Sequence, residues 1–103
     1  MYQVVKRDGR QVDFDLSRIA SAIQKAFEAT KMPYDKDIIR MLTLQVTADV
    51  APKVTNDRIN VEEIQDSVEA VLQRSGYASV AKAYILYRKN REKLREIRST
   101  VLD

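Results

Sequence analysis

Glycine and proline are unusually scarce in this chain: two of each occur in 103 residues. Both residue types interrupt or end regular structure, so their scarcity favours helices joined by short turns. The length fits one domain, and a composition of 45% hydrophobic and 32% charged residues indicates a packed core with a charged surface. No apolar run approaches the roughly 20 residues that cross a bilayer. Charged residues at positions 6–8 also interrupt any signal-peptide pattern, so we expect a cytoplasmic domain with no membrane partner.

The N-terminal segment departs from the helical pattern. Asp8-Gly9 lies between two short runs of strand-forming residues and is a strong hairpin signal. A two-residue turn at this dipeptide would place Val5 opposite Val12. The face turned towards the rest of the protein would then carry Val5, Arg7, Val12 and Phe14. Because an isolated hairpin is only marginally stable, we expect helices to lie beneath it.

Four amphipathic segments follow the hairpin, with apolar residues spaced three and four apart. The capping and breaking residues predict helices from Asp15 or Ser17 to about Thr30, from Asp35 or Asp37 to near Pro52, from Asn60 or Val61 to Gly76, and from about Ala78 towards the end. Ile59 and Val61 can add a third short strand at the edge of the hairpin. The predicted fold is therefore α+β and mostly helical, a four-helix bundle capped by an N-terminal β-hairpin.

The last helix carries an apolar stripe that thins along its length. The stripe is Ala83, Leu86, Asn90, Leu94, Ile97 and Val101. Beyond Asn90 it offers one residue per turn, which is too little for a core of this domain. We therefore expect a domain over residues 1–91 and a helical extension over residues 92–103 that leaves the bundle to pack on a missing or partner domain.

Most catalytic chemistries lack their usual residues, because the chain contains neither histidine nor cysteine. This excludes disulfides, zinc-thiolate sites, thiol nucleophiles and histidine general bases. The paired carboxylates Glu62-Glu63 and Asp66-Glu69 fall at outward positions of a helix, where a solvated face explains them. We therefore expect no catalytic site and no metal site made by the protein.

Positive charge is concentrated near the C-terminus. Residues 82–98 hold seven basic and two acidic side chains, for a net charge of +5. Such a segment suits a phosphate-bearing ligand, a nucleic acid or an acidic partner, although a solvated helix face would look the same. The glycine-rich phosphate-binding motifs are absent, so side chains would have to hold any phosphate.

One face of the last helix combines aromatic and cationic side chains. Tyr84, Tyr87, Arg88 and Arg91 recur at three- and four-residue spacing. Two aromatic rings beside two guanidinium groups can stack on a base and hold a phosphate. The same tyrosines would also serve as core residues with exposed hydroxyls, and the spacing alone does not separate these two interpretations.

Two blocks at opposite ends of the chain resemble the ATP-cone domain. The first is Val-Val-Lys-Arg-Asp-Gly-Arg at residues 4–10, followed by Phe14 and Arg18-Ile19. The second is Ile-Gln-Asp-Ser-Val-Glu at residues 64–69, followed by Gly76-Tyr77 and by Val-Ala-Lys-Ala-Tyr-Ile-Leu-Tyr-Arg at residues 80–88. The two blocks have the order and separation of that family, and the resemblance covers residues 3–91.

This resemblance implies a regulatory module in which a hairpin lid covers a nucleotide, ATP or dATP, on a four-helix bundle. It places nucleotide contacts on Val4, Lys6, Arg7, Arg18, Tyr87, Arg88, Lys89 and Arg91. Arg18 stands where lysine is common, and Val12 where the family is often acidic or polar. Whether Mg²⁺ accompanies the triphosphate stays open.

The resemblance also implies the biological setting, which is control of the activity and oligomeric state of a ribonucleotide reductase. The reductase reaction depends on cysteines, so this chain would be a non-catalytic part or a free-standing partner of that enzyme. Two alternatives remain: the ATP-cone of a nucleotide-sensing transcriptional repressor, whose zinc ribbon is missing here, and a basic helical domain that binds nucleic acid. Glu92 and Glu96 interrupt the basic segment and make nucleic acid a poor partner.

Overall fold

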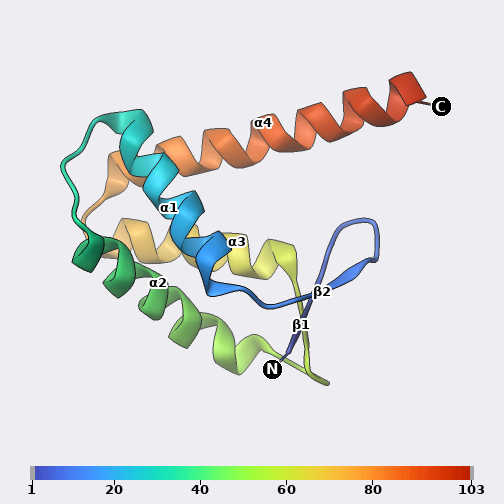
Figure 1. Cartoon of the computed structure of the whole chain (residues 1–103), viewed down its shortest axis with the longest axis horizontal. Coiled ribbons are helices and arrows are strands. Elements are labelled where there is room, and N and C mark those ends of the chain that lie inside the picture. The colour runs from blue at the N-terminus through green and yellow to red at the C-terminus, as the bar shows by residue number, and fades with distance from the viewer. Residues whose placement is uncertain (1, 103) are drawn as a thin grey trace.

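The computed structural model describes the backbone of residues 2–102 and the side chains of residues 2–98. The elements are β1 (Gln3–Val5), β2 (Gln11–Asp13), α1 (Leu16–Thr30), α2 (Lys36–Val50), a 3₁₀ turn η1 (Ala51–Lys53), β3 (Arg58–Asn60), α3 (Val61–Arg74) and α4 (Ala78–Leu102). The predicted α+β fold, with helices dominant and a small N-terminal sheet, is confirmed (Figure 1). The side chain of Val101, predicted for the apolar stripe, lies outside the described residues.

Aspartates that precede α1 and α2 start both helices. The carboxylate of Asp15 accepts a hydrogen bond from the backbone N–H of Ser17 at 3.0 Å, and that of Asp35 accepts one from Ile38 at 2.8 Å. Both bonds satisfy N–H groups that have no partner within the helix. Of the predicted pairs of caps, the structure therefore selects Asp15 and Asp35. Gly76 follows the C-terminus of α3 with a φ of +89°, as expected for the glycine predicted to end this helix.

The sheet has the strand order β2-β1-β3, with β2 antiparallel and β3 parallel to β1. The predicted third strand is confirmed, although Val61 belongs to α3. The predicted hairpin register is wrong by one residue, because Val4 and not Val5 pairs with Val12. A one-residue shift exchanges the two faces of a strand, and it is Val4 that lies in the core.

The hairpin loop explains this register. The backbone N–H of Gly9 donates to the carbonyl of Lys6 at 3.0 Å, and the N–H of Lys6 donates to the carbonyl of Arg10 at 2.8 Å. The loop therefore contains three residues, 7–9, and not two. Gly9 has a φ of +90°, the conformation that a three-residue hairpin loop requires at its last position. Arg7, predicted on the inner face of a strand, belongs to this loop.

The core lies where the four helices meet under the sheet. Helix α1 packs on α2 and α4, and α3 packs on the same two helices. Fully buried side chains from each helix fill this space, among them Ile23, Phe27, Leu42, Val46, Val71, Leu72 and Val80. The sheet adds Val4 and Ile59, and Phe14 covers the same core from the segment between β2 and α1.

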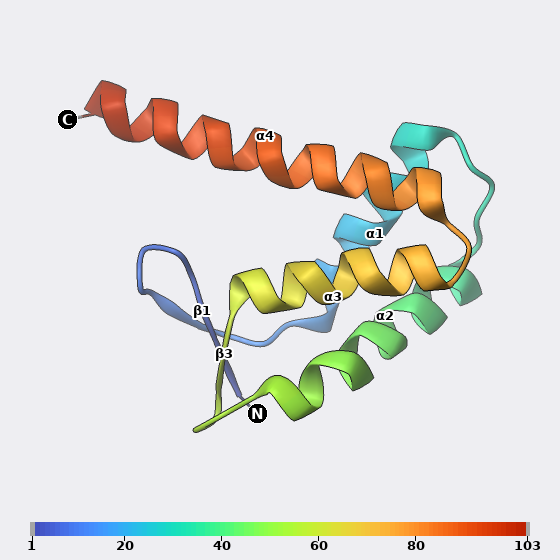
Figure 2. The same cartoon turned by 180° about the vertical axis from the view of Figure 1, so that it is seen from behind.

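Helix α4 extends well past the other helices, as Figures 1 and 2 show from opposite sides. The predicted stripe is wrong at Leu86, which is 59% exposed. Val80, Ala81 and Tyr84 form the buried face, and Ala83 packs against the core beside them. Leu94 and Ile97 are 63% and 59% exposed, so this part of the stripe does not contribute to the core. Over the residues described, no helix is long and apolar enough to traverse a bilayer.

The hairpin loop yields a prediction about Gly9. No atom lies within 4 Å of the place where a Cβ would be added there, so substitution costs conformational energy and not space. We expect Gly9→Ala to lower the free energy of unfolding by about 1 kcal/mol. Gly9→Asn should cost less, because asparagine adopts positive φ more readily. Chemical denaturation tests this order, and a larger loss for the bulkier asparagine would contradict it.

Candidate functional site

A pocket of about 470 Å³ lies between the hairpin, α1 and α4, with α3 as its base. This volume falls within the range of small-ligand sites. Its apolar wall combines Val4, Val12 and Phe14 from the hairpin segment with Ile64, Val68 and Tyr84 from the helices. Burial raises the pKa of the Tyr84 hydroxyl, consistent with its role as a core residue that faces the pocket.

Five cationic side chains from three elements line this pocket. They are Lys6 from the hairpin, Arg18 and Lys25 from α1, and Arg91 and Arg95 from α4. Asp13 and Asp15 also line it, but both carboxylates already accept hydrogen bonds, from Gln3 and from Ser17. Arg18 lies 4.0 Å from Asp15, which is a long and exposed ion pair. The pocket therefore has a surplus of positive charge and suits an anionic ligand.

The surrounding positive charge affects the pKa of Lys6. Partial burial lowers the pKa of its ammonium group, and the positive charges of Arg18, Arg95, Arg10 and Arg91 lower it further. Both effects disfavour the charged form of a lysine. An anion bound in the pocket would reverse the second effect, because an opposite charge nearby favours the ammonium form.

Tyr87 and Arg91 form a pair at the edge of the pocket. The Arg91 guanidinium donates to the Tyr87 hydroxyl at 3.0 Å and lies 5.7 Å from the centre of its ring. These contacts fix the position of one cation beside an exposed aromatic face. Of the two tyrosines on this face of α4, Tyr84 is a core residue and Tyr87 is half-buried at the site.

A second, smaller hollow of about 40 Å³ adjoins the pocket and is lined by Arg7 and Arg88. Arg7 joins the hairpin loop to two helices, at 2.9 Å from Glu62 of α3 and 2.6 Å from Glu92 of α4. Hydrogen bonding to Glu92 raises the pKa of the Arg7 guanidinium. The hairpin is therefore held over the helices by ion pairs.

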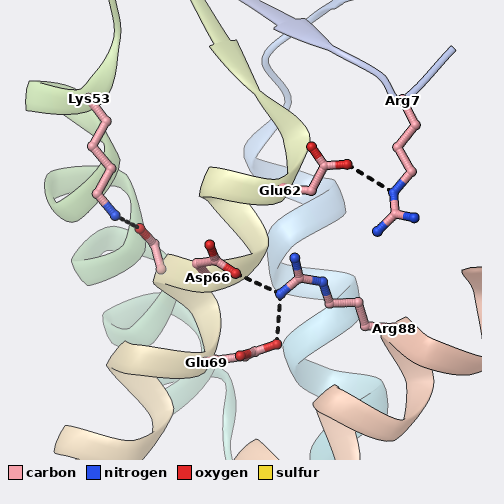
Figure 3. Close-up of polar contacts among 7 residues, drawn as sticks. Arg7, Lys53, Glu62, Asp66, Glu69 and Arg88 are labelled. Carbon is pink, nitrogen blue, oxygen red and sulfur yellow. Dashed lines mark hydrogen bonds and ion pairs between the residues drawn. The ribbon is translucent and has the colours of Figure 1, made fainter.

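Arg88 makes a similar connection between α4 and α3. It lies 2.8 Å from both Asp66 and Glu69, and Figure 3 shows it between these two carboxylates. Burial alone would lower the pKa of its guanidinium, but hydrogen bonds to the two carboxylates outweigh this and raise it. Asp66 lies at the exposed position expected of a solvated face, but it and the half-buried Glu69 pair with Arg88, which a solvated face does not explain.

The structure thus divides the eight predicted contact residues into three groups. Five line the larger pocket together: Val4, Lys6, Arg18, Tyr87 and Arg91. Arg7 and Arg88 line the adjoining hollow and are ion-paired. Lys89 is exposed and lines neither space, because it follows Arg88 by one residue and a helix turns about 100° per residue.

The prediction missed two cations of the pocket, Lys25 and Arg95. A signal for both was present in the sequence. Lys25 follows Arg18 by seven residues on α1, and Arg95 follows Arg91 by four on α4, spacings that keep side chains on one face of a helix.

Comparison with known proteins shows the family of this chain. Residues 2–93 match the family described as the ATP cone domain. The chain belongs to the ATP cone family. It is 41% identical over 98 residues to a "Ribonucleoside-diphosphate reductase subunit alpha" of Chlamydia pneumoniae, an alignment that covers 89% of this chain and 9% of the relative.

Other relatives of this ATP cone carry different reductase names. A "Vitamin B12-dependent ribonucleoside-diphosphate reductase" of Thermoplasma acidophilum is 43% identical over 99 residues, covering 91% of this chain and 12% of the relative. An "Anaerobic ribonucleoside-triphosphate reductase" of Haemophilus influenzae is 36% identical over 98 residues, covering 95% and 14%. The ATP cone therefore spans about a tenth of the length of these curated relatives.

One buried polar atom of the ATP cone is available to a ligand. Gln65 lines both hollows, and its Oε1 is buried without a hydrogen-bond partner among the described residues. A side-chain amide offers both donor and acceptor groups. Within the same part of the chain, no cluster of three acidic side chains is placed to hold a metal ion.

The lowered pKa of Lys6 yields a prediction about stability without ligand. Its folded-state pKa lies below that of the unfolded chain, so the unfolded state binds more protons and stability rises with pH through this range. We expect Lys6→Gln to raise the free energy of unfolding at about pH 7 and to lose this advantage towards about pH 10. Lys89→Gln, at an exposed position outside the pocket, should show no such trend. Denaturant titrations of the three proteins measure it, and a pH-independent gain for Lys6→Gln would contradict it.

Proposed function

We propose that this ATP cone binds ATP and dATP in the pocket under the hairpin. The observation that supports this most strongly is the gathering of Lys6, Arg18 and Arg91 around an apolar wall, where burial and then the cationic neighbours lower the pKa of Lys6. A nucleotide triphosphate combines the two features that the pocket accepts, a flat apolar base and several negative charges. Lysine and arginine are both established phosphate-binding groups.

In this proposal the predicted contact residues have two roles. Lys6, Arg18 and Arg91 hold phosphates, while Val4 and Tyr87 contact the base or ribose. Arg7 and Arg88 hold the hairpin and α4 in place through their ion pairs, and Arg7 can exchange a carboxylate for a phosphate. If Mg²⁺ accompanies the triphosphate, the phosphates themselves would supply most of its ligands, since magnesium usually binds in this way.

The regulatory role follows from the connections of the hairpin. ATP and dATP differ by one hydroxyl, and a ligand shifts a conformational equilibrium only by its difference in affinity for the two states. The hairpin loop contacts α3 and α4 through Arg7, so a change in lid position is transmitted to both helices. Coupling energies of about 1–3 kcal/mol are typical of such links.

The proposed target of this regulation is a ribonucleotide reductase, because the relatives carry that name. The ATP cone would be a non-catalytic, cytoplasmic part or partner of such an enzyme. Its extension over residues 92–103 would pack on the remainder of the reductase or on another subunit. The exposed side chains of Leu86, Leu94 and Ile97 support this, since they form an apolar face that the domain does not cover.

We expect calorimetric titration to detect binding of both ATP and dATP to the 103-residue chain. Lys6→Ala and Arg18→Ala should each weaken ATP binding by about tenfold or more, because each removes a charged hydrogen bond worth roughly 1.5–3 kcal/mol. Lys89→Ala removes the same charge outside the pocket and should change affinity little.

Two results would contradict the proposal. The first is the absence of binding of either adenine nucleotide at millimolar concentration. The second is an equal loss of affinity in all three variants, because it would show that net charge and not the pocket determines binding.

A further inference from the structure

Arg95 lies outside the segment that matches the ATP cone family, which ends at residue 93. Nevertheless it lines both the larger pocket and the adjoining hollow. Arg95 belongs to the C-terminal third of α4. This helix extends past the other helices (Figure 2). The family pattern gives no reason to expect a site residue there.

The periodicity of α4 explains how Arg95 reaches the pocket. Tyr84, Arg88, Arg91 and Arg95 follow one another at spacings of four, three and four residues, so they share one face of the helix. The exposed Leu94 and Ile97 lie on other faces, because a helix turns about 100° per residue. The helical extension thus has two surfaces, one apolar and one directed to the site.

The charge of Arg95 is available to a ligand. Among the described residues, no carboxylate forms an ion pair with it within 4 Å. The nearby Glu92 is paired with Arg7 at 2.6 Å, and the charge of Arg95 contributes only the last of the effects that lower the pKa of Glu92. The positive charge of Arg95 is also one of those that lower the pKa of Lys6, and both side chains line the same pocket.

We propose that Arg95 is a phosphate-binding residue of this site. The inference rests on the proposed function, because it takes the ligand to be a nucleoside triphosphate. Arg95 and Lys6 then contact the phosphates from two sides, one from the helical extension and one from the hairpin. A bound nucleotide would then contact α4 directly through Arg95. Its effect on this helix would not depend only on movement of the hairpin.

Calorimetry with ATP at about 0.15 M salt tests this with two variants of the whole chain, Arg95→Gln and Lys93→Gln. Both remove one positive charge from an exposed position of the same stretch of α4, but Lys93 lines neither the pocket nor the adjoining hollow and lies about 200° around the helix from Arg95. We expect Arg95→Gln to weaken ATP binding about tenfold and Lys93→Gln to change it less than about twofold. Equal affinities of the two variants would overturn the inference.

Hydrogen exchange provides a second, independent measurement. At saturating ATP, the amides of residues 92–98 should gain protection in the wild-type chain and in Lys93→Gln, but not in Arg95→Gln. Equal protection in all three proteins would overturn the role of Arg95 while leaving nucleotide binding intact. If the wild-type chain binds no nucleotide, the proposed function itself fails, so the two failures are distinguishable.

Discussion

Repulsion among like charges in a partly buried pocket is the constraint on which the account of this protein depends. The folded chain brings Lys6 close to Arg18, Arg91 and Arg95, although the arrangement lowers the pKa of Lys6 and so makes its charged form costly. Stability alone would favour fewer charges here. An anionic ligand that compensates the charges would explain why the pocket retains such a cluster, and in the proposed function this ligand is the triphosphate of ATP. Functional sites commonly carry perturbed groups of this kind.

Two other cations near the site, Arg7 and Arg88, differ from this cluster because they are ion-paired. Arg7 and Arg88 each lie between two carboxylates, at distances from 2.6 to 2.9 Å, and join the hairpin and α4 to α3. Exposed ion pairs contribute little stability individually, so their main effect is to fix the relative position of these elements. The site therefore consists of two sets of basic residues, one that is paired and positions the walls, and one that faces the cavity.

Local patterns predicted much of this fold. The helix boundaries followed from Asp15, Asp35 and Gly76, because capping and stopping depend on residues adjacent in sequence. The hairpin register could not be predicted from local patterns, because Asp8-Gly9 fits both a two-residue and a three-residue loop. The choice between these loops depends on the packing of Val4 in the core. The buried face of α4 could not be predicted either, because spacing fits Tyr84 equally as a core residue and as a ligand contact, and it places Leu86 in the core. The pairing of Arg88 depends on residues about 20 positions away, which spacing along one helix does not reveal.

The most direct test of the central claim is the pKa of Lys6, measured by NMR titration of its side-chain carbon signals with and without saturating ATP. We expect a pKa below that of an ordinary lysine in the free chain, and a clear rise when ATP is bound, because phosphates near the ammonium group favour its charged form and oppose the effects of burial and of the cationic neighbours. A Lys6 pKa that stays the same or falls on saturation with ATP would show that the phosphates do not lie in this pocket, and would contradict the account.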